Sequence, residues 1–333
     1  MFSHIYAQDA AINALKGALA NDRLAHAYLF QGPGGVGKTT TALALAHAAL
    51  CEQRPHEGCG VCAVCRRISA GQHPDVRVIR PRIEGGGNLK VDFIREEILP
   101  FSRFAPFEGR AAFLIFPDAE LSFPPHQAEA ANALLKTLEE PRSNLHFVLV
   151  SDRPKRLLPT IQSRCQSLRF SRLPNAVLQR ILAERLASQA GHDMAIALAD
   201  GRADRALWLA EEGRSQALAE KALNIDATLL QGSLSKLLDL AAGLYQDEQL
   251  DLVLTTLAWL YRDLTVNQVC GELTPVAFTS GDVLQATRHR SAPIRTERMA
   301  QHVAAIRRTE RALERTVNKQ LALEALLFEL AQP

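Results

Sequence analysis

Short apolar runs alternate with helical stretches over the first 170 residues of the chain. The runs have the length and the residue types of buried strands: AHAYLF (25–30), DVRVI (75–79), AAFLIF (111–116), HFVLVS (146–151) and SLRF (167–170). The stretch KTTTALALAHAAL (38–50) between the first two has the composition of a helix. Strands that alternate with helices are typical of a parallel sheet with covering helices. We therefore expect an α/β domain over residues 1–170.

The strand pattern ends after Phe170. Pro174 opens a stretch with apolar residues on one helical face, and residues 194–213 continue as helix with a turn at Gly201. This pattern predicts a small helical domain over residues 171–213. From residue 214 onward nearly all of the chain has a helical pattern, which predicts a third, all-helical domain over 214–333. Its last segment repeats apolar residues at spacings of three, four or seven: Val303, Ile306, Leu313, Val317, Leu321 and Phe328.

Composition narrows the class of protein. The chain of 333 residues is 47% hydrophobic and 22% charged, as is ordinary for a folded protein. No run of about 18 apolar residues occurs, and the start MFSHIYAQDA lacks the features of a signal peptide, so we expect a cytoplasmic protein without a membrane partner. A net charge of +2 is below the strongly basic balance of proteins that bind DNA alone, so any DNA contact is shared or local.

A phosphate-binding loop follows the first predicted strand. The stretch QGPGGVGKTT fits G-x-x-x-x-G-K-[ST] at every fixed position, between a strand and a helix. Its glycines allow backbone N–H groups to surround phosphate oxygens, Lys38 would neutralise the terminal phosphates, and Thr39 would bind magnesium. The alternative is a glycine-rich turn without a ligand. We assign ATP and Mg²⁺ binding to Gly32, Pro33, Gly34, Gly35, Val36, Gly37, Lys38, Thr39 and Thr40.

Hydrolysis of a bound nucleotide needs a carboxylate at the end of a neighbouring strand. The candidate strand AAFLIF ends in Pro117 and Asp118, and proline cannot bind a metal through its side chain. Asp118 and Glu120 are the acids that follow, and Asp118 is either a turn residue or a magnesium-linked residue of the nucleotide site. The sequence therefore predicts a site that holds ATP but cleaves it weakly or not at all.

Four cysteines lie within fifteen residues: Cys51, Cys59, Cys62 and Cys65. Their C-x7-C-x2-C-x2-C spacing suits four thiolates around tetrahedral Zn²⁺, and with all four positions filled by protein the zinc would be structural. The ferredoxin pattern for an iron–sulfur cluster requires a further cysteine where Ser69 stands. Free thiols, an iron–sulfur cluster and a metal site that uses His56 stay open as alternatives.

Several stretches together resemble one family. They are RLAHAYLFQGPGGVGKTT (23–40), the cysteine cluster over 51–65, AGQHPDV (70–76), AANALLKTLEEP (130–141) and SRC (163–165). They are similar to the clamp-loader subunits of bacterial DNA polymerase III, which are AAA+ ATPases. The C-terminal stretch TVNKQLALEALLFEL (316–330) more loosely resembles the end of the delta-prime type of subunit.

This resemblance implies a fold, partners and one further residue. It implies an AAA+ domain, a helical lid and a helical collar, in a five-subunit ring with gamma or tau and delta subunits that loads the sliding clamp onto primer-template DNA. Arg164 matches the arginine that reaches into the ATP site of the neighbouring subunit, an arginine finger in trans. Without the resemblance, the arginine-rich stretch around Arg164 favours a role as one more surface cation.

Two nucleotide-sensing positions depart from the family pattern. The first would fall near Ser151 and Asp152, where the match is loose. At the second position, Asp204 stands where hydrolysing members carry an arginine. Arg205 follows one residue later, and one residue corresponds to about 100° of rotation around a helix. We therefore expect a scaffold subunit; an ATP-hydrolysing gamma-type subunit and a free-standing zinc-containing DNA-binding module are the alternatives.

Overall fold

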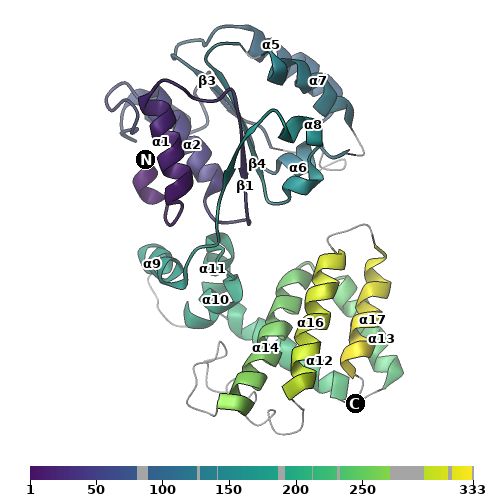
Figure 1. Cartoon of the computed structure of the whole chain (residues 1–333). Helices are drawn as coiled ribbons and strands as arrows, with labels where there is room; N and C mark the ends of the chain where they lie inside the picture. Colours follow the sequence, from purple (N-terminus) through teal and green to yellow (C-terminus); the bar gives the residue numbers. More distant parts are fainter. Residues whose placement is uncertain are drawn as a thin grey trace. The chain divides into compact units, whose positions relative to one another are not determined.

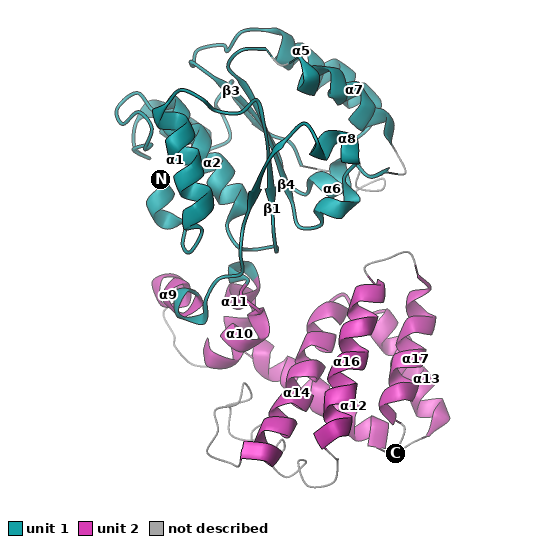
Figure 2. Cartoon of the chain, in the orientation of Figure 1, with its two compact units in different colours: residues 1–177, 202–204 teal, residues 178–201, 205–333 magenta. Residues whose placement is uncertain are grey.

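The chain divides into two compact units, which are described separately (Figure 2). Unit 1 comprises Met1–Val177 and Arg202–Asp204, and unit 2 comprises Leu178–Gly201 and Arg205–Pro333. The division into a lid (171–213) and a collar (214–333) stays a prediction. The computed structural model describes residues 1–80, 89–125, 128–140, 142–186, 192–211, 213–230, 233–270, 296–313 and 317–331.

Unit 1 is built on a five-stranded sheet with the order β2-β3-β4-β1-β5, in which every neighbouring pair is parallel. The strands are β1 (Ala27–Gln31), β2 (Val76–Val78), β3 (Ala112–Phe116), β4 (Leu145–Ser151) and β5 (Gln166–Arg169). Each lies within or overlaps one of the apolar runs, so the predicted parallel α/β fold is confirmed. Because the three central strands are covered on both faces, their residues form nearly continuous apolar runs. All residues of β3 and β4 are buried, whereas the edge strands β2 and β5 are partly exposed.

Helices cover both faces of this sheet (Figure 1). The helical elements of unit 1 are η1 (Phe2–His4), α1 (Asp9–Ala20), α2 (Lys38–Leu50), α3 (Ala63–Ser69), α4 (Val91–Phe93), the π-helical turn η2 (Ile94–Ile98), α5 (Leu99–Arg103), α6 (Ala119–Ser122), α7 (Ala128–Glu139), η4 (Pro154–Arg156) and α8 (Pro159–Gln162). α1 and α2 lie on one face, and α5 to α8 lie on the other. Leu134 and Leu138 of α7, one helical turn apart, join Leu114 and Phe147 of the sheet in one apolar core.

The described residues of unit 2 form helices and the short connections between them. Its helices are α9 (Asn175–Arg185), α10 (His192–Ala199), α11 (Ala203–Ala210), α12 (Arg214–Leu230), α13 (Leu234–Tyr245), α14 (Leu250–Cys270), α16 (Thr296–Leu313) and α17 (Lys319–Ala331); α9 and α11 each contain residues of both units. α14 packs against α12 and α16, and α17 packs against α13 and α16. The predicted helical C-terminal region is confirmed, except that residues 271–295 lie outside the described part. None of the described helices combines the length and apolar character needed to span a membrane.

Only some members of the apolar repeat in the C-terminal segment are buried. Ile306 is fully buried, but Val317 and Leu321 are 40% and 62% exposed. The core of α17 is formed instead by Leu323, Leu326, Leu327 and Leu330. The repeat runs across two helices, since α16 ends at Leu313 and α17 begins at Lys319, and the second helix has its own rotational phase.

Candidate functional site

The phosphate loop connects β1 to α2 and needs glycine at particular positions. Gly35 and Gly37 have φ angles of +65° and +98°, in the left-handed region that favours glycine. A β-carbon on Gly32 would overlap the carbonyl oxygen of Phe170 at the end of β5. The glycines therefore let the loop turn sharply at the carboxyl edge of the sheet and start α2 directly at Lys38.

Lys38 is held inside this loop by its own chain. Its Nζ lies 2.7 Å from Oδ1 of Asp152 and donates hydrogen bonds to the carbonyl oxygens of Gly32, at 2.8 Å, and Pro33. Only 3% of the Lys38 side chain is exposed. The buried ammonium is therefore neutralised by a carboxylate from the end of β4.

The other predicted nucleotide residues lie together in the loop and the first turn of α2. Val36 is buried, Thr39 is half-buried and Thr40 is exposed. The N-terminus of α2 presents backbone N–H groups, which favour a phosphate group. Thr41 is turned away from such a role, because its hydroxyl donates to the carbonyl oxygen of Gly37 at 2.8 Å. This arrangement suits nucleotide phosphates, and the assignment of individual ligands stays a prediction.

The end of β3 does not supply a metal ligand in the expected place. Pro117 is buried, and Asp118 adopts a left-handed φ of +52° with its side chain exposed. Glu120 is instead 7% exposed, and its Oε1 accepts a hydrogen bond from the backbone N–H of Asp152 at 3.2 Å. The second oxygen of Glu120 has no hydrogen-bond partner among the described residues. The buried acid near the loop is therefore Glu120, and a magnesium-linked role for Asp118 stays a prediction.

A second carboxylate approaches the loop from the start of α11. The backbone N–H of Ala203 donates to the carbonyl oxygen of Gly35 at 2.9 Å. A β-carbon on Gly35 would overlap the carboxylate of Asp204, so these groups are in close contact. Arg202 forms an ion pair with Asp204 at 3.0 Å. The sequence identified Asp204 only as a departure from the family pattern; its contact with Gly35 depends on tertiary structure.

Arg205, the neighbouring residue, belongs to unit 2. It forms an ion pair with Asp251 of α14. Its guanidinium is therefore engaged within the helical unit.

Arg164 lies between α8 and β5 and is partly exposed, at 32% of its side chain. It forms an ion pair with Glu139 at the end of α7, and its Nη1 donates to the carbonyl oxygen of Thr160 at 2.9 Å. Its buried Nε has no hydrogen-bond partner among the described residues. The guanidinium is thus held near the surface by contacts within the chain, and the arginine-finger role stays a prediction.

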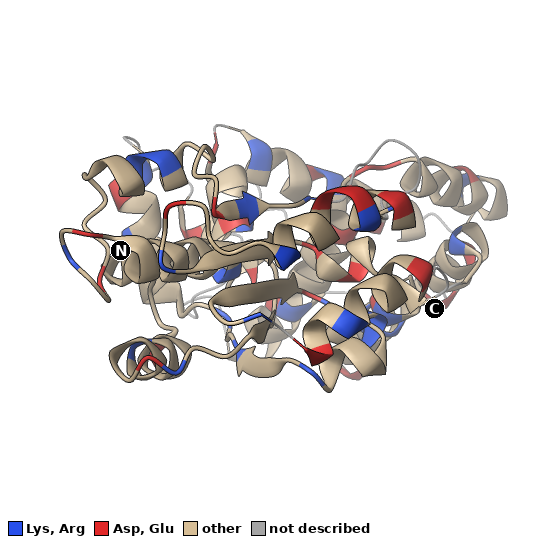
Figure 3. Ribbon diagram, turned by 90° about the horizontal axis from the view of Figure 1, so that it is seen from above, with Lys and Arg blue, Asp and Glu red and all other residues tan. Residues whose placement is uncertain are grey.

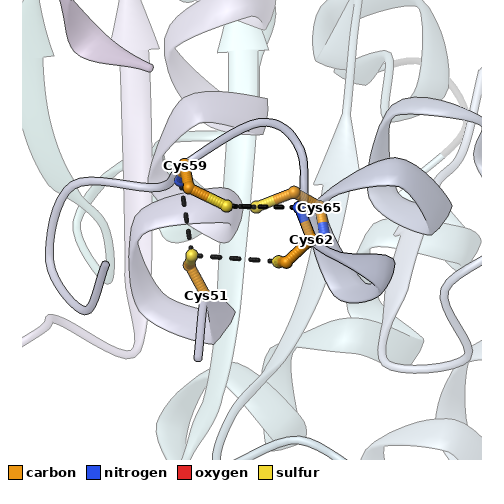
Figure 4. A group of neighbouring side chains, drawn as sticks. All are labelled: Cys51, Cys59, Cys62 and Cys65. Atoms are coloured by element: carbon orange, nitrogen blue, oxygen red, sulfur yellow. Dashed lines mark hydrogen bonds between the residues drawn. The ribbon is translucent and has the colours of Figure 1, made fainter. Parts of the chain in front are cut away.

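The four cysteines come together between α2 and α3 (Figure 4). Their sulfur atoms all lie within 4.8 Å of one another, and the pairs Cys51–Cys62 and Cys59–Cys65 are 4.0 Å apart. Zn–S bonds of about 2.3 Å place tetrahedral sulfurs about 3.8 Å apart. The cluster therefore fits a zinc ion with only small movements of the side chains.

Local backbone geometry prepares these thiols for a metal. Gly60 has a φ of +76°, which gives the tight turn between Cys59 and Cys62. Hydrogen bonds from the N–H groups of Val61 and Cys62 lower the pKa of the Cys59 thiol to about 6. Burial raises the pKa of the Cys65 thiol to about 12 in the absence of metal. A bound cation would offset the cost of burying the Cys65 thiolate, because a thiol that coordinates a metal ion is deprotonated.

His56, the ligand of the alternative metal site, is not among the residues that converge. The cluster of metal-ligating groups found among the described residues is formed by the four cysteines alone. The site can hold a metal ion through four protein ligands, and it connects the helix that follows the phosphate loop to α3.

The parallel sheet, the glycine-rich loop between β1 and α2, and the buried lysine at the start of α2 define a P-loop fold. A family profile described as "DNA polymerase III, delta subunit" matches residues 7–174, which is half of the chain. This chain therefore belongs to that family.

Three individual proteins are similar to this chain in sequence. The chain is 36% identical over 176 residues to DNA polymerase III subunit delta' of Bacillus subtilis, which covers 53% of this chain and 51% of the relative. It is 41% identical over 142 residues to subunit delta' of Pseudomonas aeruginosa, covering 42% of each chain. It is 34% identical over 244 residues to subunit tau of B. subtilis, covering 71% of this chain and 41% of the relative. The chain thus spans about half or less of the length of the relatives that it matches.

Proposed function

We propose that this chain is a delta-prime-type subunit of a bacterial DNA polymerase III clamp loader. In this role it assembles with gamma or tau and delta subunits in the cytoplasm and helps to load the sliding clamp onto primer-template DNA. The family match and the two delta' relatives support this assignment.

The subunit acts as a scaffold rather than as a motor. The observation that carries this proposal is the end of β3, where Pro117 is buried and Asp118 points into solvent from a left-handed turn. Without a carboxylate at this position the magnesium shell of ATP lacks one of its usual protein ligands. Lys38 and Thr39 can still hold ATP and Mg²⁺, but turnover at this site is weak or absent.

Arg164 provides the catalytic contribution of the subunit, at the ATP site of its neighbour. Its partial exposure supports a guanidinium that can exchange its contact with Glu139 for a phosphate on another chain. An arginine finger supplied in trans increases turnover by roughly 1,000-fold to 100,000-fold. We expect Arg164→Ala to lower ATP turnover at the neighbouring site by an effect within that range.

The test is a loader reconstituted from the full chain with gamma or tau and delta subunits. Native mass spectrometry reports whether the ring assembles, and single-turnover ATP hydrolysis reports the neighbouring site. Arg156→Ala, an exposed arginine of η4, is the matched control. An assembled Arg164→Ala ring with unchanged turnover would exclude the finger role.

The four cysteines hold a structural zinc ion. The sulfur separations, the N–H groups directed at Cys59 and the absence of an open ligand position support this proposal. When bound, the zinc ion would cross-link the chain between the end of α2 and the start of α3. It would take no part in a reaction with a substrate.

A motor subunit of the gamma or tau type is the second candidate. It is favoured by the similarity to subunit tau over 71% of this chain and by the complete phosphate loop. Purified chain that hydrolyses ATP alone, and that loses this activity in Lys38→Ala, would support the motor role over the scaffold role.

The distribution of charged residues disfavours the third candidate function, a free-standing DNA-binding module. Acidic and basic residues are interspersed along the ribbon in Figure 3, in agreement with the net charge of +2. Phosphate neutralisation makes DNA binding fall steeply with salt. A titration of the isolated chain that shows tight binding with a steep salt dependence would restore this possibility.

A further inference from the structure

The donor capacity of Lys38 is fully used within the chain. An ammonium group has three N–H donors. In this structure they meet Asp152 at 2.7 Å, the carbonyl of Gly32 at 2.8 Å and the carbonyl of Pro33. A phosphate group that enters the loop must therefore replace one of these acceptors.

Asp152 is the acceptor that a phosphate most resembles. It carries a negative charge on two oxygens, and it is the first residue after β4. Its Oδ1 contacts Lys38, and its Oδ2 would lie 2.5 Å from a β-carbon on Gly34. The carboxylate therefore lies against the loop, beside the lysine that contacts the β- and γ-phosphates in P-loop proteins.

Asp204 adds a second negative charge on the same loop. Its carboxylate is in contact with Gly35 and pairs with Arg202, whose Nη2 also lies at Gly34, so that Lys38 and Arg202 balance the two carboxylates of the loop. A nucleoside triphosphate brings several further negative charges to this place. Like charges in such close contact cost several kcal/mol unless a cation separates them.

We propose that Asp152 occupies the terminal-phosphate position of the Lys38 loop and competes with nucleoside triphosphates for it, so that the chain binds ATP weakly. The proposal rests on the nucleotide-binding part of the proposed function, and it is independent of Arg164. Because Lys38 contacts the terminal phosphates, the competition affects ATP more than ADP.

The experiment is calorimetric titration of the full-length chain with MgATP and with MgADP. Asp152→Asn keeps the shape of the side chain and removes its charge, and it leaves the backbone hydrogen bond to Glu120 intact. We expect the affinity for MgATP to rise by at least about tenfold, and the affinity for MgADP to rise less. Lys38→Ala in the Asp152→Asn background should abolish the gain.

Two further variants keep the test decisive. Asp92→Asn removes a charge from the exposed side chain of α4 and should leave both affinities unchanged. Asp152→Ser removes the carboxylate by a different substitution, so a folding defect specific to asparagine cannot hide the effect. Circular dichroism melting curves confirm that each variant is folded.

The other outcomes overturn the proposal in distinguishable ways. Tight and equal MgATP binding by the wild type and Asp152→Asn would show that Asp152 does not compete, while nucleotide binding at the loop stands. No binding by any variant would remove both the competition and the nucleotide-binding role. Weaker MgATP binding by Asp152→Asn, with metal-free ATP unaffected, would make Asp152 a magnesium ligand.

Discussion

Asp75 is the residue whose replacement should destabilise unit 1 most clearly. It belongs to the AGQHPDV stretch, precedes β2 and is 2% exposed. Its carboxylate accepts hydrogen bonds from the backbone N–H groups of Phe107, Glu108, at 3.0 Å, and Gly109, at 2.7 Å. One side chain therefore satisfies three successive donors of the loop that leads into β3.

The magnitude follows from these three bonds. A hydrogen bond to a charged group contributes about 1.5–3 kcal/mol, so three give roughly 4–9 kcal/mol as an upper range. The loop N–H groups are only partly buried, and some can reach water once the carboxylate is gone. We therefore expect Asp75→Ala to lower the free energy of unfolding of unit 1 by about 3–5 kcal/mol, a large share of a typical total of about 5–15 kcal/mol. Asp75→Asn retains an acceptor oxygen and should lose about half as much.

The assay must report unit 1 separately, because a chain with two units need not unfold in one step. Hydrogen exchange measured by mass spectrometry across a urea series gives the unfolding midpoint of peptides from β1, β3 and β4. The same data report protection at residues 107–109, which should fall first. Asp92→Ala is the control and should change stability by no more than about 0.5 kcal/mol. If Asp75→Ala had the same unfolding midpoint as Asp92→Ala, and the hydrogen-exchange protection of residues 107–109 were unchanged, the argument from the three hydrogen bonds would be refuted.

Two further effects are expected. Purified chain should contain about one equivalent of zinc, and a strong chelator or Cys65→Ser should lower the urea midpoint of the α2–α3 peptides; less than about half an equivalent of zinc would contradict the four-cysteine site. Burial, with the charge of Arg298, lowers the pKa of His302 below its usual value despite Asp226 and Glu329. The unfolded state then binds more protons below about pH 6.5, so stability should fall as pH drops from 6.5 toward the lowered pKa. Urea midpoints of unit 2 at pH 7.5 and 5.5 measure this, and a pH dependence identical in His302→Leu would exclude His302 as its source.

The sequence was sufficient for features that depend on local pattern. Strands buried on both faces appear as continuous apolar runs, so β3 and β4 could be placed within one or two residues. The phosphate loop follows from the spacing of its glycines and lysine. The cysteine spacing predicted a converging group, and the four sulfurs do converge within 4.8 Å.

Features that depend on contacts between distant segments could not be predicted. Neither the ion pair of Lys38 with Asp152 nor the contact of Gly35 with Asp204 leaves a periodic or compositional signal. Glu120 was identified as an acid near the end of β3, but its burial follows from the path of α6. The spacing of the C-terminal repeat likewise did not show which of its members are buried, because its residues belong to two helices, α16 and α17.

These internal contacts change what the loop motif implies about activity. A lysine that is 3% exposed would be destabilising without a counter-charge, and Asp152 supplies that charge within the chain. Gly35 is required by its φ of +65° and by the contact with Asp204, whether or not a nucleotide binds. The residues that define the motif therefore have a structural role in the free chain. It follows that a complete motif alone does not establish ATP turnover at this loop.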